Sequence, residues 1–344
     1  MTKRLYNVPM FWRAKVLTVG AGTRDVFVKS KKFEHHSDAH APDGFDACFP
    51  MGAKIALDDV VFETGGGATN AAVTFRRFGL GTACACRVGD DDDGKAVIRA
   101  LKNNSIRLTA VQTEKNAKTS YSVILLSGSG HRSILAYRGA SNDLDPQNIP
   151  WKKIQPKWVY LTSMGGDMKK NRAIITQAKK QGSRIAWNPG NGELTHGLKA
   201  LKPLLTQTDI LIFNREEAAL LAQEPPRMLD RIVSALTGLA RTALIVTDGP
   251  NGAFAFETDA EYGLYAPAVP GKRINTTGAG DSFGSALVAA YIKTHSLQTG
   301  LKAGALNSLG VITHMGAKAG ILKRFPTPTE FNKVRIKTID LENA

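Results

Sequence analysis

The chain has 344 residues, of which 43% are hydrophobic and 22% charged, and it carries a formal net charge of +15 at pH 7. These values are typical of a globular protein with a sizeable core, and they predict one large domain with a smaller appendage. No apolar run is long enough to span a bilayer and no signal-peptide core is evident, so we expect a cytoplasmic protein without a membrane segment. Three cysteines without a C-x-x-C pair argue against a disulfide framework.

The basic residues are scattered in short clusters such as Lys152-Lys153, Lys169-Lys170 and Lys179-Lys180. A nucleic-acid-binding tract would gather such residues on one stretch with interleaved aromatic side chains. The dispersion favours a solvated basic surface that attracts phosphorylated metabolites, and a nucleic-acid partner is the less favoured interpretation.

Short β-rich runs alternate with helical patterns over most of the chain. This alternation is typical of βαβ units, so we predict an α/β fold whose central, mainly parallel sheet is flanked by helices on both faces. The predicted strands are residues 15–20, 82–88, 158–161, 184–187, 209–213 and 242–247. The predicted helices are residues 68–78, 169–180, 216–222, 228–239, 279–294 and 297–314.

One segment breaks this alternation. Three β-prone runs follow one another without intervening helices, at residues 107–111, 120–126 and 131–137. We interpret them, together with residues 26–61, as a small sheet that stands off the main domain as a lid; the alternative is that they extend the main sheet. The predicted organisation is a domain over 15–330 with lid segments at about 26–61 and 106–138, an N-terminal extension over 1–14 and a C-terminal tail over 331–344.

An anion cradle with a built-in base is predicted over residues 275–283, where small residues, one carboxylate and the start of an apolar helix coincide. Gly278 and Gly280 carry no Cβ, so the backbone can turn tightly and present N–H groups to an anion. A helix that begins near Ala279 adds its unpaired donors and its positive dipole end. Asp281 beside such a site is suited to take a proton from an attacking hydroxyl. The alternative is an ordinary loop with an N-capping Asp.

A second Gly-rich turn, Gly65-Gly66-Gly67-Ala68-Thr69-Asn70, leads into the first predicted helix. Three successive glycines allow a polar ligand to approach the backbone closely, and Asn70 offers a donor and an acceptor that suit a vicinal diol. Asp25 lies just past the first predicted strand, at the edge where open α/β sheets place ligands. Taken alone, each of these features also fits a purely structural turn.

Thr277-Gly278-Ala279-Gly280-Asp281, together with the turn over residues 65–70, resembles the two signatures of the PfkB (ribokinase-like) family of carbohydrate and nucleoside kinases. The resemblance runs from about residue 16 to about residue 321. It implies a ribokinase-like fold in which the lid covers the sugar site and often builds a dimer interface. It further implies that Asp25, Gly66, Gly67 and Asn70 bind the sugar, and that Asp281 is the general base beside an anion hole formed by the backbone of Gly278, Ala279 and Gly280.

Further motifs match the family's nucleotide and metal elements. Asn214 and Glu217 match Asn-x-x-Glu, which implies a Mg²⁺ site that Glu217 serves through water, although the same pattern is also a capping box. The resemblance implies nucleotide contacts at Asn188, Thr247, Gly249, Gly252 and Asn307, with Asn307 near the adenine. Asn275 stands where the family usually has an Asp that helps bind an activating monovalent cation, so K⁺ activation is expected to be weak or absent.

The sequence therefore predicts a kinase that uses ATP and Mg²⁺ to phosphorylate a primary hydroxyl of a small sugar, with K⁺ as a further candidate ion. Two alternatives stay open. A nucleoside kinase would need an apolar pocket under the lid, which Phe27, Phe33, Phe45 and Phe49 lie in the right segment to supply. A non-catalytic nucleotide- or nucleic-acid-binding protein is suggested only by the basic charge. A homodimer through the lid is the candidate assembly.

Overall fold

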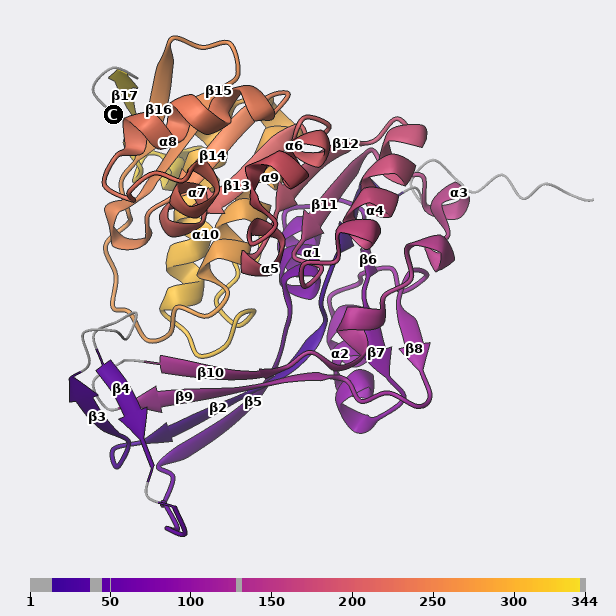
Figure 1. Ribbon diagram of the computed structural model, residues 1–344, viewed down its shortest axis with the longest axis vertical. Helices are drawn as coiled ribbons and strands as arrows, with labels where there is room; N and C mark the ends of the chain where they lie inside the picture. Colours follow the sequence, from indigo (N-terminus) through magenta and orange to yellow (C-terminus); the bar gives the residue numbers. More distant parts are fainter. Residues whose placement is uncertain (1–13, 38–44, 50, 128–131, 341–344) are drawn as a thin grey trace, which may run out of the picture.

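The computed structural model describes residues 14–37, 45–49, 51–127 and 132–340. Within these residues the largest sheet has nine strands, in the order β17-β16-β15-β14-β13-β12-β11-β1-β6 (Figure 1). The strand bounds are β1 (Val16–Val19), β6 (Thr82–Ala85), β11 (Trp158–Thr162), β12 (Arg184–Asn188), β13 (Ile210–Asn214), β14 (Ala243–Thr247), β15 (Ala253–Glu257), β16 (Tyr262–Ala266) and β17 (Lys337–Asp340). The strands from β6 to β14 are parallel and the pairs from β14 to β17 are antiparallel, which confirms the predicted mainly parallel sheet.

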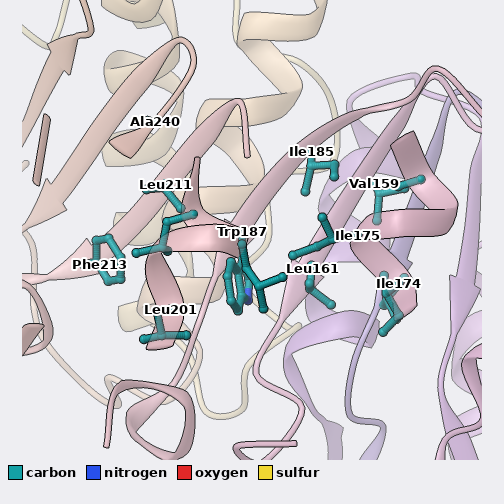
Figure 2. Close-up of a cluster of buried hydrophobic side chains, with 14 of the residues drawn as sticks. Val159, Leu161, Ile174, Ile175, Ile185, Trp187, Leu201, Leu211, Phe213 and Ala240 are labelled. Carbon is teal, nitrogen blue, oxygen red and sulfur yellow. The ribbon is translucent and has the colours of Figure 1, made fainter. Parts of the chain in front are cut away.

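Helices cover both faces of this sheet because its central strands are apolar on both sides. Along β12, Ile185 and Trp187 face one layer of helices and Ala186 faces the other. Figure 2 shows Trp187 at the centre of the first layer, beside Leu161 and Leu211. The first layer holds α4, α6, α7 and α8, and the second holds α1, α9 and α10. The helix bounds are α1 (Gly67–Arg77), α2 (Asp92–Asn103), α3 (Trp151–Ile154), α4 (Met168–Lys180), α5 (Asn191–Leu194), α6 (Gly197–Leu205), α7 (Arg215–Ala222), α8 (Leu229–Leu236), α9 (Ala279–Thr294), α10 (Leu297–Ile312) and α11 (Pro328–Phe331). None of the described helices is long and apolar enough to cross a membrane.

A second, four-stranded sheet stands apart from the main sheet, and we call it the lid. Its strands are β2 (Thr23–Ser30), β5 (Asp59–Gly65), β9 (Ser120–Ser127) and β10 (Arg132–Tyr137), in the order β10-β9-β2-β5. In Figure 1 the lid projects beneath the main domain, with the hairpin of β3 (Glu34–Ser37) and β4 (Phe45–Cys48) at its far end. Its register places Asp25 of β2 beside Glu63 of β5 and Ser122 of β9.

The structure corrects two boundaries. Residues 107–111 do not belong to the lid: Arg107 forms a bridge with Ala83 at the edge of the main sheet, and the next strand, β8 (Gln112–Glu114), pairs with β7 (Arg87–Gly89). The predicted tail over 331–344 contains part of the main sheet, because β17 pairs with β16 and forms an edge of that sheet; residues 341–344 lie outside the described residues. The predicted extension over 1–14 lies outside the described residues except for Ala14, as do residues 38–44, 50 and 128–131 of the lid segments.

Candidate active site

The turn that precedes α9 has the form of an anion cradle. Gly278 adopts φ 80°, and a Cβ built on it would lie 2.5 Å from the Cβ of Ala317, so both its conformation and its neighbour require glycine. The N–H of Ala279 donates to the Thr276 carbonyl at 3.2 Å. The hydrogen bonds among the described residues leave the N–H groups of Gly278 and Gly280 without an acceptor. Two of the three predicted anion-hole donors are therefore available, and Ala279 is occupied within the turn.

Asp281 lies in the first turn of α9, and its Oδ2 accepts a hydrogen bond of 2.9 Å from Nδ2 of Asn70 on α1. Burial raises the pKa of the Asp281 carboxyl above its usual value, while the Asn70 hydrogen bond and the Lys318 ammonium oppose this rise and Asp25 adds to it. A carboxylate with a raised pKa is a better proton acceptor than an exposed one, which suits a general base. The bond to Asn70 was not predicted from the sequence.

The predicted sugar-binding residues converge on the space next to Asp281. Asp25 is buried, and its Oδ1 accepts a hydrogen bond of 2.8 Å from the Thr23 hydroxyl. Gly65 closes β5 against it, since a Cβ there would lie 1.8 Å from Oδ2 of Asp25. Asn70 is 3% exposed, and its Oδ1 is a buried acceptor without a partner among the described residues. A ligand hydroxyl would satisfy this oxygen.

Gly66 and Gly67 connect the lid to α1. Gly66 adopts φ 94°, and a Cβ there would lie 2.4 Å from the carbonyl oxygen of Ala21. Gly67 is the first residue of α1, and a Cβ there would lie 3.0 Å from Cβ of Thr162. The close approach of the backbone to its neighbours therefore explains these glycines at least as well as ligand contact does.

Lys318 is the residue of this region that sequence reasoning missed. It is 7% exposed, and its Nζ donates to the Thr64 carbonyl oxygen at 2.5 Å. Burial lowers the pKa of Lys318 to about 8, and the nearby carboxylates of Asp25, Asp281 and Glu63 oppose this shift. Its only sequence signal is its place two residues after Gly316.

A pocket of about 730 Å³ opens beside the start of α9, a size that suits a nucleotide-sized ligand. Thr247, Gly249 and Gly252 line it from the turn between β14 and β15, and Ala279 and Gly280 line it from α9. An apolar wall that the sequence did not suggest completes it, formed by Val269, Phe283, Ala305, Leu309 and Ile312. The cradle and this pocket are thus continuous.

Asn307 does not line this pocket. It is fully buried, its Nδ2 donates to the Ser282 carbonyl at 2.9 Å, and its Oδ1 accepts from the Leu322 N–H at 2.9 Å. The position of Asn307 therefore does not favour the expected contact with the adenine. Its side-chain amide instead holds α10 against α9 and against the segment at Leu322. Its neighbours Ala305 and Ser308 face the pocket instead.

Glu217 lies in the first turn of α7, where its Oε2 accepts the Asn214 N–H at 2.9 Å and the Asn214 side chain caps the helix in return. Asn214 and Glu217 therefore form the capping box, which uses Oε2 of Glu217 and leaves Oε1 available to a ligand. Burial raises the pKa of Glu217. Asn188 is the last residue of β12, which pairs with β13, the strand that leads into α7. Its Nδ2 donates to the Ile212 carbonyl at 2.9 Å. Neither residue lines the pocket, whereas Glu216 does.

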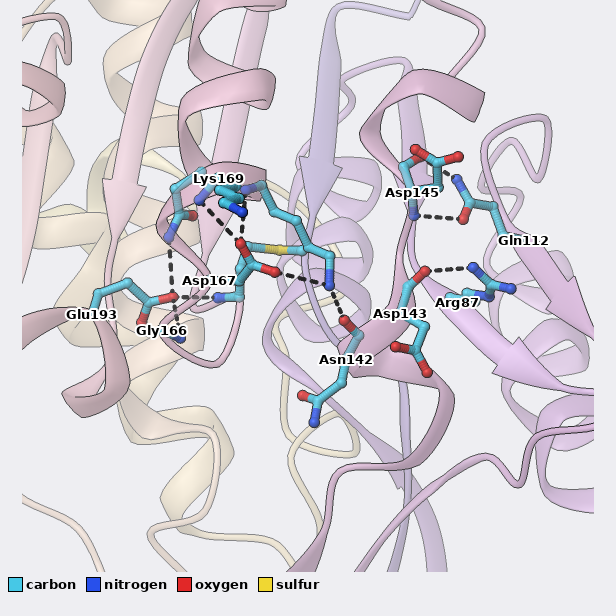
Figure 3. Close-up of polar contacts among 12 residues, drawn as sticks. Arg87, Gln112, Asn142, Asp143, Asp145, Gly166, Asp167, Lys169 and Glu193 are labelled. Atoms are coloured by element: carbon cyan, nitrogen blue, oxygen red, sulfur yellow. Dashed lines mark hydrogen bonds and ion pairs between the residues drawn. The ribbon is translucent and has the colours of Figure 1, made fainter.

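The loops at this edge of the sheet are held by one carboxylate. Glu193 is fully buried and accepts hydrogen bonds from the N–H groups of Met164, Gly166 and Gly190. Figure 3 shows the bond from Gly166. These bonds fix the turns that follow β11 and β12, which border Asn188. Glu193 therefore has a structural role, and its charge contributes to the raised pKa of Glu217.

Asn275 does not offer a cation site. Its Oδ1 accepts the Thr277 N–H at 3.0 Å, so its Nδ2 faces the remaining buried space, where it has no partner among the described residues. An N–H group directed into that space repels a cation. The chain's own residues at this position therefore do not fit the monovalent ion that the resemblance suggests.

Comparisons with known proteins show the family of the chain. Residues 42–324 match the model of the pfkB family carbohydrate kinases, so the chain belongs to the pfkB family, and it is a kinase that phosphorylates an alcohol group. It is 25% identical over 291 residues to a probable fructokinase-5 of Arabidopsis thaliana, a match that covers 78% of this chain and 87% of that protein. It is 27% identical over 248 residues to a ribokinase of Mus musculus, covering 69% of this chain and 75% of that protein. Among solved structures, Arabidopsis thaliana ribokinase complexed with ribose and ATP superimposes with a TM-score of 0.71 at 21% identity, covering 93% of this chain and 98% of that one.

Proposed function

We propose that this protein transfers the γ-phosphoryl group of ATP to a primary hydroxyl of a small carbohydrate. The observation that carries the proposal is the junction at the start of α9. There the Asp281 carboxylate, bonded to Asn70, adjoins backbone N–H groups without an acceptor and a pocket of nucleotide size. A base and an anion cradle on one helix terminus are the two elements that phosphoryl transfer needs most.

In this mechanism the sugar hydroxyl lies between Asp25, Asn70 and Asp281. Asp25 accepts hydrogen bonds from neighbouring hydroxyls, and the unpaired Oδ1 of Asn70 accepts another. Asp281 takes the proton of the attacking sugar hydroxyl. The hydroxyl oxygen bonds to the γ-phosphorus, while the bond between that phosphorus and the oxygen that bridges it to the β-phosphate breaks. ADP carries away the electron pair of that bond. The N–H groups of Gly278 and Gly280 stabilise the charge on the transferring phosphoryl oxygens.

ATP in this proposal occupies the pocket beside α9, with its base against the apolar wall and its phosphates toward Gly280. Glu217 would hold Mg²⁺ through water with its second carboxylate oxygen, and the ion would neutralise charge on the ATP phosphates. One protein carboxylate is enough for such an ion because the phosphates supply the remaining charged ligands.

A sugar is favoured over a nucleoside as the acceptor. Phe27 is 1% exposed and packs with Ile124 and Leu126 inside the lid, so it is unavailable to a nucleobase. Phe33 packs edge-on against Phe49 at 5.3 Å between ring centroids. The side chain of Phe45 lies outside the described residues. The family supports kinase activity, which makes a purely non-catalytic role the least favoured.

The lid also supports a homodimer. Val60 and Phe62 of β5 and Leu135 and Tyr137 of β10 are 40–60% exposed on the two outer strands of the lid, and the register places Phe62 and Leu135 in one row across the sheet. A second copy that covers these side chains would remove a large apolar area from water. We propose this face as the dimer contact, and light scattering of the wild type against Phe62→Lys would test it: a dimer that becomes a monomer supports it, and an unchanged mass contradicts it.

The experiment that tests the function measures ADP formation by the purified protein with MgATP against a panel of sugars and nucleosides, each with and without K⁺. Turnover on one or more sugars supports the proposal. Asp281→Asn should bind ATP with unchanged affinity by calorimetry yet lower kcat by about 10²- to 10⁴-fold, the usual contribution of a general base. Turnover on nucleosides alone, or normal kcat in Asp281→Asn, would overturn the acceptor class or the base, respectively.

A further inference from the structure

The segment that carries Lys318 is wedged between the anion cradle and the lid. Ala317 packs against Gly278, and a Cβ on Gly316 would lie 2.8 Å from Cγ of Glu63 on β5. The Lys318 side chain leaves this segment toward the lid and ends on the Thr64 carbonyl oxygen. Its ammonium is thereby fixed at the junction of the main domain and the lid, next to the residues assigned above to the acceptor.

Acidic residues lie on the chain segments that meet at this junction. Thr64, whose carbonyl accepts the lysine bond, follows Glu63 and precedes Gly65, and a Cβ on Gly65 would lie 1.8 Å from Oδ2 of Asp25. On the other side, Ala317 contacts Gly278, three residues before Asp281. The charges of Asp25, Asp281, Glu63 and the Cys84 thiol oppose the lowering of the Lys318 pKa by burial. No carboxylate oxygen among the described residues lies within 4 Å of Nζ, so the lysine is not consumed by one ion pair. One fixed positive charge therefore acts on three carboxylates at once. The Asp281 carboxylate accepts its hydrogen bond from Asn70 and interacts electrostatically with Asp25, Glu217, Tyr160 and Lys318.

We propose that Lys318 is the fixed counter-charge of the acceptor site, a positioning residue whose ammonium offsets the repulsion between the Asp25 and Asp281 carboxylates. This inference deepens the proposed function and rests on it for its catalytic meaning. Two neighbouring buried carboxylates oppose each other's ionisation, and one of them takes up a proton unless a positive charge offsets the repulsion. The neutral Asn275 side chain brings no charge of its own, whereas the Lys318 ammonium is held at this junction by its bond to Thr64.

The first test is the pKa of Asp281 itself, measured by the ¹³Cγ shift of labelled aspartate and assigned by its loss in Asp281→Asn. Lys318→Gln can still donate an amide N–H toward Thr64 but carries no charge, and we expect it to raise the Asp281 pKa by about one unit or more. Lys318→Arg retains the charge and should leave the Asp281 pKa nearly unchanged. An unchanged pKa in Lys318→Gln would overturn the proposal.

A matched control is Lys293, which also donates to a backbone carbonyl, that of Phe78, at 3.2 Å. It lies at the other end of α9, about 18 Å along the helix axis from Asp281 at 1.5 Å per residue. Lys293→Gln removes a similar lysine-to-carbonyl bond and should not move the Asp281 pKa. A shift in this control equal to that in Lys318→Gln would also overturn the proposal.

Asp25→Asn supplies an independent measurement if Lys318→Gln does not fold. It removes the negative charge that raises the Asp281 pKa, so that pKa should fall. An unchanged Asp281 pKa would contradict the electrostatic coupling between these residues. These titrations need no turnover, so they test the role of Lys318 even if no acceptor in the panel is phosphorylated. The absence of phosphoryl transfer would overturn only the proposed kinase mechanism. With an active acceptor, the acid limb of kcat should move to higher pH in Lys318→Gln, and the loss of rate should shrink as pH rises from 5 to 7. A purely structural role would lower kcat equally at every pH.

Discussion

The two glycines of the cradle should respond to the same substitution in opposite ways. Gly278→Ala places a side chain at φ 80°, which costs about 1–2 kcal/mol, and its Cβ overlaps Ala317 at 2.5 Å, which costs about 1–3 kcal/mol more. The free energy of unfolding should fall by about 2–5 kcal/mol. For a chain of this size, that corresponds to a fall in Tm of about 3–7 °C.

Gly280→Ala meets no atom within 4 Å, and Gly280 has no positive φ. Because alanine favours a helix more than glycine does, Tm should stay constant or rise slightly. The new methyl group projects into the open space at the pocket wall where we place the transferring phosphoryl group. We expect kcat/KM for ATP to fall by about 100-fold, comparable to the loss of one anion-hole donor.

The assay is calorimetric melting together with coupled ADP detection on the same two preparations. The reasoning fails if Gly278→Ala melts like the wild type, since the steric conflict would then be absent. It fails equally if Gly280→Ala turns over normally, because the open space beside α9 would then not hold the phosphoryl group.

Further outcomes follow from other parts of the site. Replacing Na⁺ with K⁺ should change wild-type turnover less than about twofold, whereas Asn275→Asp should make turnover respond to K⁺. Strong K⁺ activation of the wild type in initial-rate assays would contradict the conclusion that Asn275 does not suit a monovalent cation. Asn307→Leu should lower the free energy of unfolding by about 3 kcal/mol in urea titrations, because it leaves buried donors and acceptors unpaired, while the affinity for ATP stays within a few fold; a selective loss of ATP binding would restore the adenine contact. Because the Asp281 pKa is raised and the carboxylate must be ionised to accept a proton, kcat should fall as pH drops through a value above about 4, the usual Asp pKa; a pH profile that stays flat to pH 4 would contradict this.

Local sequence patterns were sufficient to predict those elements whose residues favour one conformation. The bounds of α9, residues 279–294, were predicted correctly because small apolar residues recur at helical spacing after Gly278 and no proline interrupts them; in the structure, Gly278 and His295 cap the two ends. The buried parallel strands were also predictable from their continuous apolar runs. The antiparallel strands β15 to β17 were not, since their short runs are partly exposed and their pairing depends on the neighbour that each finds.

Residues that act through the tertiary structure could not be predicted in the same way. Lys318 resembles any surface lysine until the fold buries it among three carboxylates. Asn307 was assigned to the pocket, but one residue on a helix turns the side chain by about 100°, and Ser308 lines the pocket in its place. The Asn70 to Asp281 bond joins residues 211 positions apart, which no local pattern indicates.

The pairing of β17 with β16 has a consequence for the order of folding during synthesis. The lid, the cradle and Asp281 are all translated before residues 337–340, yet β16 presents an open edge until that last strand arrives. At about 5–20 residues per second the ribosome needs about 4–14 seconds to make the roughly 70 intervening residues, and some of them remain in the exit tunnel for longer. During that interval the half of the sheet that borders the nucleotide pocket carries unpaired backbone groups that favour association with other chains. Chaperone demand and sensitivity to premature termination should therefore concentrate in the interval between β16 and β17, residues 267–336.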